Sequence, residues 1–340
     1  MNIAAIIVNY RTPHLTLKCL EALSNERKFL PDLKAIVVDN GSCDDSGPIL
    51  SDAIEQSSFS EWVEYLPLSL NGGFGWGNNQ AILHLLKRQA RPEAFFLLNP
   101  DTVIERGALR SLVDYLIEQP DAGAVGSQLV NPDGSLAGSA FRFPTVAREF
   151  IRGINLGRIG RVLGIAPTLV PYGTRGAVDW VTGASVLLRR EALEQVGLFD
   201  TGFFLYFEEV ELMHRLGRHG WVAYHCPESR VTHIAGASSG VVDGKTAGNH
   251  VPPDYVFRSR RRFFVLTGGK SKALWANLAW LTGDSLRRAI ATISGRRTVG
   301  SAAESKALLR IGLRANEKDA MAAFDTVDHD VGGLPAWMNS

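Results

Sequence analysis

Four carboxylates directly follow apolar or aromatic runs of the sequence. Asp39 and Asp101 each follow a short apolar run, and Glu208 and Glu209 follow an aromatic segment. Carboxylate oxygens accept protons and N–H groups, and they are the ligands that hard divalent cations prefer. The pattern therefore indicates a site that binds a nucleotide or a cation and moves a proton.

Asp39 begins the sequence Asp-Asn-Gly-Ser at the end of a predicted strand. A carboxylate there can accept a hydrogen bond from the imide N–H of uracil or thymine. Asp, Asn and Gly also favour turns, so a purely turn-forming role is the alternative. This segment alone leaves both interpretations open.

Asp101, in Asn99-Pro100-Asp101, is the candidate metal ligand. A departing diphosphate needs a hard cation to offset its growing charge, and such cations (Mg²⁺ or Mn²⁺) take oxygen ligands. Asp101 fits as the protein ligand, with phosphates supplying most of the others, and a neutral His233 imidazole would complete the shell. The alternatives are a turn or cap for Asp101 and a structural histidine.

Glu209 is the candidate general base, with Glu208 second. The preceding aromatic residues, 203–207, offer apolar walls that raise a carboxylate pKa towards useful values. Acidic first turns also occur simply because they suit the helix dipole, which is the alternative. Arg215 lies four residues beyond Glu211, on the same helical face.

The segment 71–79 combines four glycines with asparagines and two aromatic residues. Glycines let the backbone approach a ligand closely, and Asn78 and Asn79 are expected at a helix N-terminus, which favours anions. Phe74 and Trp76 are expected to be exposed and to stack on a base or a sugar. A flexible surface loop is the alternative.

Familiar nucleotide-binding loops are excluded by the sequence. After the first predicted strand, 10–13 reads Tyr-Arg-Thr-Pro rather than a glycine fingerprint, and a phosphate loop ending at 244–246 would need glycine where Ser239 stands. Lys and Arg number 36 against 35 Asp and Glu, so the net charge of +1 gives no field that selects nucleic acid.

The cysteine and N-terminal patterns indicate a cytoplasmic protein. Cys19, Cys43 and Cys226 are odd in number and far apart, which shows no disulfide framework and fits a reducing compartment. The apolar run 2–8 has no basic leader and is too short to span a membrane.

The elements that must position these residues alternate between strand and helix, which predicts an α/β fold with ligands bound beyond the carboxyl ends of the strands. Strands are expected at 3–8, 35–38, 63–65, 95–98 and 178–189, with helices after 12 and around 81–86, 190–196 and 208–215, and with a mobile loop or short helices over 150–172. We divide the chain into a catalytic domain, 1–250, and a helical C-terminal region, 251–340, with a poorly ordered tail.

The C-terminal region combines arginines at 258 and 260–262 with a Trp/Leu helix around Trp275 and Trp280. Such a helix could rest on an anionic membrane surface. The alternatives are packing on the catalytic domain or across a homodimer interface.

Together these segments resemble glycosyltransferase family 2, the large inverting family with the GT-A-type nucleotide-sugar-binding sheet, and within it the rhamnosyltransferases of bacterial cell-surface polysaccharide assembly. The resemblance spans roughly residues 3 to 265. The matching stretches are 7–10, 38–42, 71–75, 97–101, 181–184, 187–190, 197–200, 204–209 and 231–233.

The resemblance implies a metal-dependent inverting transferase that moves a sugar, with rhamnose the leading guess, from a dTDP- or UDP-sugar to a hydroxyl of a glycan or lipid-linked glycan. Asp101 and His233 would hold the metal and Glu209 would be the base. Trp180, Gly183 and Arg215 would form the acceptor or sugar pocket. The residues expected to contact the nucleotide sugar are Asn9, Arg11, Asp39, Asn71, Gly73, Phe74, Asn79 and Asn99.

One departure from the family pattern concerns the base. The family usually has Glu-Asp where this chain has Glu208-Glu209, and a displaced carboxylate can impair catalysis. A nucleotidyltransferase and a catalytically silent sugar-nucleotide-binding scaffold are therefore kept as alternatives, although the first normally needs a glycine-rich basic loop after strand one.

Overall fold

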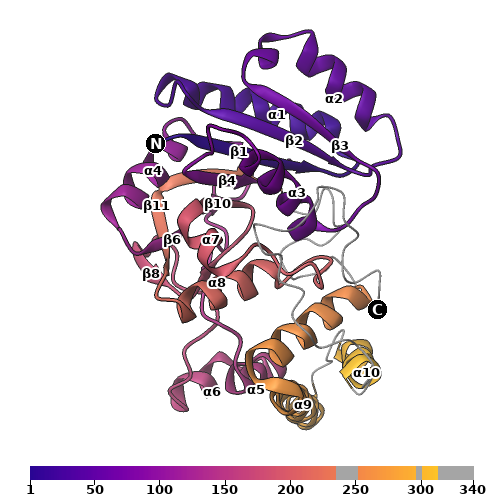
Figure 1. Cartoon of the computed structure of the whole chain (residues 1–340). Helices are drawn as coiled ribbons and strands as arrows, with labels where there is room; N and C mark the ends of the chain where they lie inside the picture. The colour runs from indigo at the N-terminus through magenta and orange to yellow at the C-terminus, as the bar shows by residue number, and fades with distance from the viewer. Residues whose placement is uncertain (235–251, 296–300, 313–340) are drawn as a thin grey trace.

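A mixed β-sheet forms the centre of the molecule (Figure 1). The computed structural model describes residues 1–234, 252–295 and 301–312. The strand order is β3-β2-β1-β4-β10-β6-β11-β5, and β8 pairs with β11. The strands are β1 (Ile3–Asn9), β2 (Lys34–Asn40), β3 (Val63–Leu68), β4 (Ala94–Leu98), β5 (Thr102–Ile104), β6 (Ala122–Val130), β8 (Gly176–Val178), β10 (Ser185–Arg189) and β11 (Val222–His233), while β7 (Ala140–Phe141) and β9 (Trp180–Val181) form a separate pair.

Helices cover both faces of this sheet (Figure 1). The helices are α1 (Pro13–Ser24), α2 (Ser46–Glu55), α3 (Phe74–Leu86), α4 (Ala108–Glu118), α5 (Val146–Ile154), α6 (Gly157–Val162), α7 (Arg190–Val196), α8 (Glu208–Arg218), α9 (Asp254–Ile293) and α10 (Ser301–Gly312), with short 3₁₀ turns η1 (Asn25–Lys28) and η2 (Ser58–Glu61).

Alternation of side chains along the strands creates the two halves of the core. In β1, Ile3, Ala5 and Ile7 pack with residues of α1, α2 and α4, whereas Ala4 and Ile6 pack with residues of α3, α7 and α8. Successive strand residues point to opposite faces, and both faces of β1 and β4 are buried. The expected α/β fold is confirmed.

Strand directions bring several chain segments to one edge of the sheet. β1, β2, β3 and β4 are parallel, so their carboxyl ends share that edge. β10 is antiparallel to β4 and to β6, and β11 is parallel to β6. The start of β10 and the end of β11 therefore lie at the same edge as the ends of β1, β2 and β4.

Two expected elements differ from the structure. The glycine-rich segment is not a loop throughout, because α3 begins at Phe74 and includes Gly75 and Gly77. A Cβ on Gly75 would lie 2.9 Å from Phe199 Cβ, and one on Gly77 would lie 2.9 Å from Val8 Cγ1, so close packing requires these glycines. The single strand expected over 178–189 is instead divided among β8, β9 and β10.

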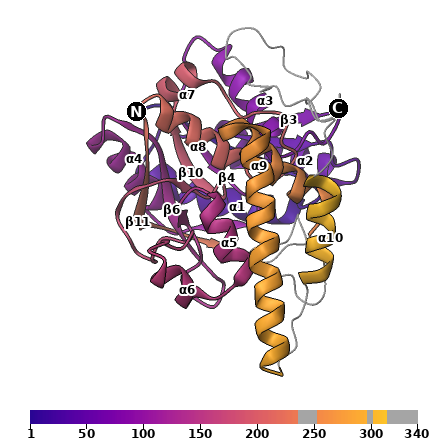
Figure 2. The ribbon, with the colours of Figure 1, turned by 90° about the horizontal axis from the view of Figure 1, so that it is seen from below.

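The C-terminal helices pack beside α5, as Figure 2 shows, where the second half of α9 extends beyond the rest of the ribbon. Non-helical backbone at Gly268 and Gly269 divides α9 in two. The expected helical C-terminal region is confirmed, and its tail, 313–340, lies outside the described residues. None of the described helices combines the length and apolarity needed to cross a membrane.

The arginine cluster of this region is not a surface patch. Arg260, Arg261 and Arg262 are buried or nearly so, and only Arg258 is exposed. Trp280 is also buried, 3% exposed, while Trp275 is 61% exposed. The expectation that these arginines and Trp280 rest on an anionic surface is therefore wrong.

Candidate active site

Asp39 is held at the end of β2 by two polar neighbours. Asn9 Nδ2 donates to Asp39 Oδ1 at 2.9 Å, and the Ser42 hydroxyl donates a short hydrogen bond to the same oxygen. Within the described part of the chain, Asp39 Oδ2 has no hydrogen-bond donor and remains available to a ligand N–H group. The hydrogen bonds to Oδ1 thus orient the Asp39 carboxylate, and Oδ2 is left to bind a ligand.

Asn9 orients Asp39 from a fully buried position. It is 0% exposed, and its Oδ1 accepts hydrogen bonds from the Thr12 amide at 3.2 Å and the Thr16 hydroxyl at 3.0 Å. Both polar atoms of its side chain have protein partners, so Asn9 orients the Asp39 carboxylate from within the core. Arg11, by contrast, is exposed and has a positive φ of 57°.

Tyr65 and Gly47 lie beside the Oδ2 atom of Asp39. A Cβ on Gly47 would lie 3.3 Å from the Tyr65 hydroxyl and 3.9 Å from Asp39 Oδ2, so only glycine leaves this approach open. Burial, and to a smaller degree the Asp39 carboxylate, raises the pKa of Tyr65 to about 12. The tyrosine therefore stays neutral beside the acid.

The glycine-containing segment before α3, residues 71–73, packs against the loop that leads into α8, residues 200–207. Gly73 has a φ of 94°, its Cβ would lie 2.0 Å from the Phe204 carbonyl oxygen, and the Phe74 amide donates to that same oxygen at 3.1 Å. Asn71 Oδ1 accepts from the Gly73 amide at 3.0 Å and from Asn40 Nδ2 at 3.0 Å. Asn71 and Gly73 thus shape the edge that connects β2 to the α8 loop.

Two residues of this segment do not reach the site as expected. Trp76 is 1% exposed, so it cannot stack on a ligand. Asn79 lies in the second turn of α3 and is 0% exposed, with Nδ2 donating to the Phe199 carbonyl at 2.8 Å and Oδ1 accepting from the Phe199 amide at 3.0 Å. Asn79 joins α3 to the turn before α8. Phe74 is half-buried and meets Phe199 edge to face.

Asp101 and His233 come together at the end of the sheet. The end of β11 pairs with β5, and His233 Nε2 lies 3.3 Å from Asp101 Oδ1. Asp101 is 4% exposed, and its Oδ1 is buried without a hydrogen-bond partner among the residues that the structure describes. A buried carboxylate oxygen without a donor fits a cation ligand, since burial without a partner is costly.

Within 1–234, 252–295 and 301–312 no group of three or more His, Cys, Asp or Glu side chains could hold a metal by itself. Asp101 and His233 are two such groups. They suit a hard cation that receives its remaining oxygen ligands from a diphosphate and from water.

A short chain of contacts connects Asp101 to the carboxylates of α8. The Asn99 amide donates to the Ala184 carbonyl at 2.9 Å, which places the segment before β10 against the strand end that carries Asp101. A Cβ on the adjacent Gly183 would lie 3.0 Å from Phe74 Cε1 and 3.9 Å from Glu209 Cβ. Glu209 therefore faces the segment that leads into β10, beside the strand end that carries Asp101.

Glu208 and Glu209 differ in what they face. The Glu208 side chain lies against α3, with its Cβ 3.5 Å from the position of a Cβ on Gly75, whereas Glu209 faces Gly183. Glu208 is 3% exposed and Glu209 is half-buried. In each, Oε2 is buried and has no hydrogen-bond partner in the described ranges.

Burial sets the protonation of this pair. Burial raises the pKa of Glu209 to about 7, and burial together with the Glu209 charge raises the pKa of Glu208 well above its ordinary value. Hydrogen bonds from backbone amides at the start of α8 lower both values, but burial outweighs them. Glu209 can therefore exchange a proton near neutral pH, and burial disfavours the ionised form of Glu208.

The backbone before these carboxylates is strained. Tyr206 has a φ of 68° and Phe207 a φ of 71°, a left-handed conformation that bulky residues rarely adopt. Such strain persists only where the surroundings impose it, and it is common at functional sites. The two residues turn the chain so that Glu208 and Glu209 begin α8 at the sheet edge.

Trp180 and Arg215 make contacts within the protein that support the elements around the candidate site. Trp180 stacks on Phe141, with ring centroids 4.2 Å apart, and donates to the Arg142 carbonyl. Arg215 is 6% exposed, forms the expected ion pair with Glu211, and donates to the backbone carbonyls of residues 196–198. Arg215 thus anchors α8 to the segment that follows α7.

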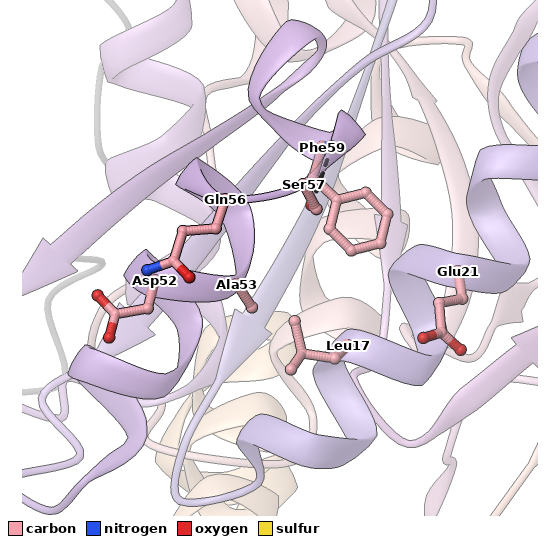
Figure 3. A pocket seen from close by; sticks show the side chains of 7 residues that line it. All are labelled: Leu17, Glu21, Asp52, Ala53, Gln56, Ser57 and Phe59. Atoms are coloured by element: carbon pink, nitrogen blue, oxygen red, sulfur yellow. Dashed lines mark hydrogen bonds between the residues drawn. The ribbon is translucent and has the colours of Figure 1, made fainter.

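A separate groove of about 340 Å³ lies between α1 and α2 (Figure 3). It is lined by Leu17 and Glu21 of α1, by residues of α2 near its end, and by Phe59. None of the lining residues belongs to the sheet edge that carries Asp39, Asp101 and Glu209, so this groove is not part of the candidate active site.

Comparison with known proteins agrees with this geometry. The profile described as "Glycosyltransferase like family 2" matches residues 1–247. N-acetylglucosaminyl-diphospho-decaprenol L-rhamnosyltransferase of Mycobacterium tuberculosis is 29% identical over 247 residues, covering 67% of this chain and 75% of that protein. Rhamnosyltransferase WbbL of Escherichia coli K12 is 26% identical over 195 residues, covering 56% of this chain and 71% of that protein.

Solved structures show the same fold. Mannosyltransferase PcManGT from Pyrobaculum calidifontis, in complex with GDP-Man and Mn²⁺, has a TM-score of 0.55 at 16% identity and covers 92% of this chain and 81% of that one. GalNAc-T7 with UDP, GalNAc and Mn²⁺ has a TM-score of 0.53 at 15% identity, with coverage of 81% and 52%. The expected GT-A-type fold is confirmed, and the chain belongs to glycosyltransferase family 2 as a sugar-transferring enzyme similar to the rhamnosyltransferases of polysaccharide assembly.

Proposed function

We propose that the protein is a metal-dependent inverting glycosyltransferase that moves a sugar, rhamnose in the first instance, from a dTDP- or UDP-sugar to a hydroxyl of a glycan or lipid-linked glycan. One observation carries this proposal. Glu209, a half-buried carboxylate whose pKa burial raises to about 7, faces Gly183 just before β10, and β10 begins beside the end of β4 that leads to Asp101 and its neighbour His233. The family match argues against the nucleotidyltransferase alternative.

Asp101 and His233 would hold the cation. When bound, a divalent cation neutralises charge on the departing diphosphate. The structurally similar proteins PcManGT and GalNAc-T7 are in complex with Mn²⁺, which supports a divalent ion here, either Mg²⁺ or Mn²⁺. Asp39 would accept the imide N–H of the pyrimidine through Oδ2, beside the neutral Tyr65.

Glu209 would take the proton of the acceptor hydroxyl at Oε2. The acceptor oxygen then attacks the anomeric carbon from the face opposite the leaving diphosphate, so a single displacement inverts the configuration. The transition state has the oxocarbenium character known from glycosidases. Because burial disfavours the charged form of Glu208, we assign the proton transfer to Glu209. This division of roles accommodates the Glu-Glu sequence.

The M. tuberculosis relative is named for a diphospho-decaprenol acceptor, which supports a lipid-linked acceptor and a peripheral position on the inner face of the cell membrane. The surface that would carry this contact is the outer face of the second half of α9. Between 273 and 295 its exposed positions bear no charged side chain. Its exposed large apolar residues are Leu274, Trp275, Leu278, Leu286, Ile290 and Ile293.

Trp275→Ser tests that contact. The variant should bind vesicles of anionic lipid more weakly than the wild type in a sedimentation assay. Unchanged vesicle binding would refute the membrane contact. A concentration-dependent dimer that the substitution dissociates would instead assign this face to a second copy of the chain. We also propose that the catalytic domain ends at residue 250 and that a helical C-terminal region, 251–340, follows it.

A thermal-shift screen of nucleotide sugars with and without Mg²⁺ or Mn²⁺ tests the proposed function. Only a ligand that prefers the native state raises Tm. We expect a dTDP- or UDP-sugar to stabilise the protein only when a cation is present, and we expect nucleoside diphosphate release to require an acceptor. Stabilisation without release under any acceptor would identify a binding scaffold instead.

A further inference from the structure

The first half of α9 packs against the loop that leads into α8, residues 200–207. Ser259 Oγ donates to the Leu205 carbonyl at 3.0 Å. The Tyr255 ring meets Phe204 edge to face at 5.4 Å and stacks on Tyr206 at 6.3 Å with an interplanar angle of 18°. A helix more than forty residues away in sequence therefore touches the segment that precedes Glu208 and Glu209.

The strongest of these contacts is an ion pair between Arg262 and Asp200. Asp200 is 0% exposed, and Arg262 Nη2 donates to its two carboxylate oxygens at 2.9 and 2.8 Å, while Nε donates to Oδ2 at 3.2 Å. The Gly202 amide donates to Asp200 Oδ1 at 2.8 Å, and a Cβ on Gly202 would lie 2.2 Å from Arg262 Cζ. The guanidinium thus lies directly on the loop backbone.

Contacts from outside the loop 200–207 are needed to stabilise its conformation. The left-handed backbone at Tyr206 and Phe207 is unfavourable by itself and persists only where contacts impose it. The loop also contacts the glycine segment through the Phe204 carbonyl, so its position affects both sides of the site. A planar guanidinium paired with a buried carboxylate supplies a directional restraint that an ammonium group would not.

We propose that Arg262 is a positioning residue for sugar transfer: its pairing with Asp200 fixes the loop 200–207 and thereby aims Glu209 at the acceptor hydroxyl. The inference rests on the proposed function, in which Glu209 takes the acceptor proton. It gives Arg262 of α9 a positioning role in the reaction, although the family profile ends at residue 247.

A second ion pair on the same helix provides a matched control. Arg260 is 4% exposed, and its Nε and Nη2 donate to Glu149 Oε2 at 3.2 and 2.8 Å. Glu149 belongs to α5, and Arg260 also donates to Asn277 Oδ1 and to the Ala276 carbonyl in the second half of α9. Both arginines thus pair with a buried carboxylate, but Arg260 is bonded to α5 and α9, whereas Arg262 is bonded to the segment before α8.

The test compares Arg262→Lys with Arg260→Lys by amide hydrogen exchange and by steady-state kinetics. Lysine keeps the charge but loses the planar fork. We expect Arg262→Lys to speed exchange over 200–207 and to lower kcat by up to about 100-fold with little change in the donor KM, since a misaimed base weakens the transition state. Arg260→Lys should speed exchange in α5 and leave kcat within about twofold of the wild type.

The exchange measurement separates this inference from the proposed function. If the wild type transfers no sugar, the proposed function is refuted. Amide hydrogen exchange over 200–207 would still show whether Arg262 restrains the loop. Wild-type exchange and wild-type kcat in Arg262→Lys would overturn the inference, as would an equal loss of kcat in both variants. If Arg262→Lys does not fold, Asp200→Asn is expected to reproduce its loop exchange and its loss of kcat.

Discussion

Replacing Glu209 by Gln should stabilise the protein in a pH-dependent way while abolishing transfer. Burial raises the pKa of Glu209 from 4.5 to about 7, and each pKa unit corresponds to about 1.4 kcal/mol. The carboxyl ionises at lower pH in the unfolded chain than in the native state, so the stability of the wild type falls as pH rises from about 4.5 to about 7.

At pH 8 the carboxyl is ionised in both states, and burying its charge costs the native protein about 3 kcal/mol. At pH 5 the native carboxyl is protonated and the cost is below about 1 kcal/mol. Gln is neutral at both pH values, so Glu209→Gln should be more stable than the wild type by about 3 kcal/mol at pH 8 and by much less at pH 5.

Urea unfolding at pH 5 and pH 8, with linear extrapolation to zero denaturant, measures both differences. Glu55→Gln, which changes an exposed glutamate of α2, is the control and should alter stability by less than about 0.5 kcal/mol at either pH. An equal effect of Glu209→Gln at the two pH values would refute the argument from burial. Full transfer activity of Glu209→Gln would refute the role of Glu209 as the base.

Three further substitutions test the geometry of the site. Asp101→Asn should abolish transfer and remove the cation-dependent part of the donor-induced rise in Tm, while far-UV circular dichroism stays unchanged. Gly73→Ala would place a Cβ 2.0 Å from the Phe204 carbonyl oxygen at a φ of 94°, so it should lower stability by about 1–3 kcal/mol in urea unfolding and raise the donor KM. Asn79→Ala leaves the buried amide and carbonyl of Phe199 unpaired. It should lower the free energy of unfolding by about 1–3 kcal/mol without changing the donor KM. A higher donor KM at unchanged stability would show instead that Asn79 contacts the donor.

The α/β architecture was predictable because its strands and helices have clear periodicity. The apolar runs that begin at Ile3 and Ala94 form β1 and β4, and the helix expected over 190–196 is α7. The start of α3 was not predictable, since glycines normally interrupt helices. Gly75 and Gly77 are tolerated there because their neighbours, distant in sequence, leave no room for a Cβ.

The positions of Asp39, Asp101 and His233 at strand ends were predictable because their residue types follow apolar runs, and their roles in binding stay predictions. Residues that hold other residues in place were not predictable. Arg262 acts through its hydrogen bonds to Asp200, 62 positions away, and such a distant pairing leaves no local pattern in the sequence.

Exposure was equally hard to predict. Trp76, Asn79 and Arg215 have residue types suited to ligand binding, yet tertiary packing buries all three. The aromatic residues before Glu209, by contrast, correctly indicated a raised pKa, since their apolar side chains remove water from the carboxylate.

The most direct test of the central claim is the stereochemistry of the reaction, followed by proton NMR. With dTDP-rhamnose, a divalent cation and a lipid-linked glycan acceptor, the wild type should form a product whose anomeric configuration is opposite to that of the donor, and Glu209→Gln should form none. A product with retained configuration, or equal product formation by both proteins, would contradict a single displacement in which Glu209 takes the acceptor proton.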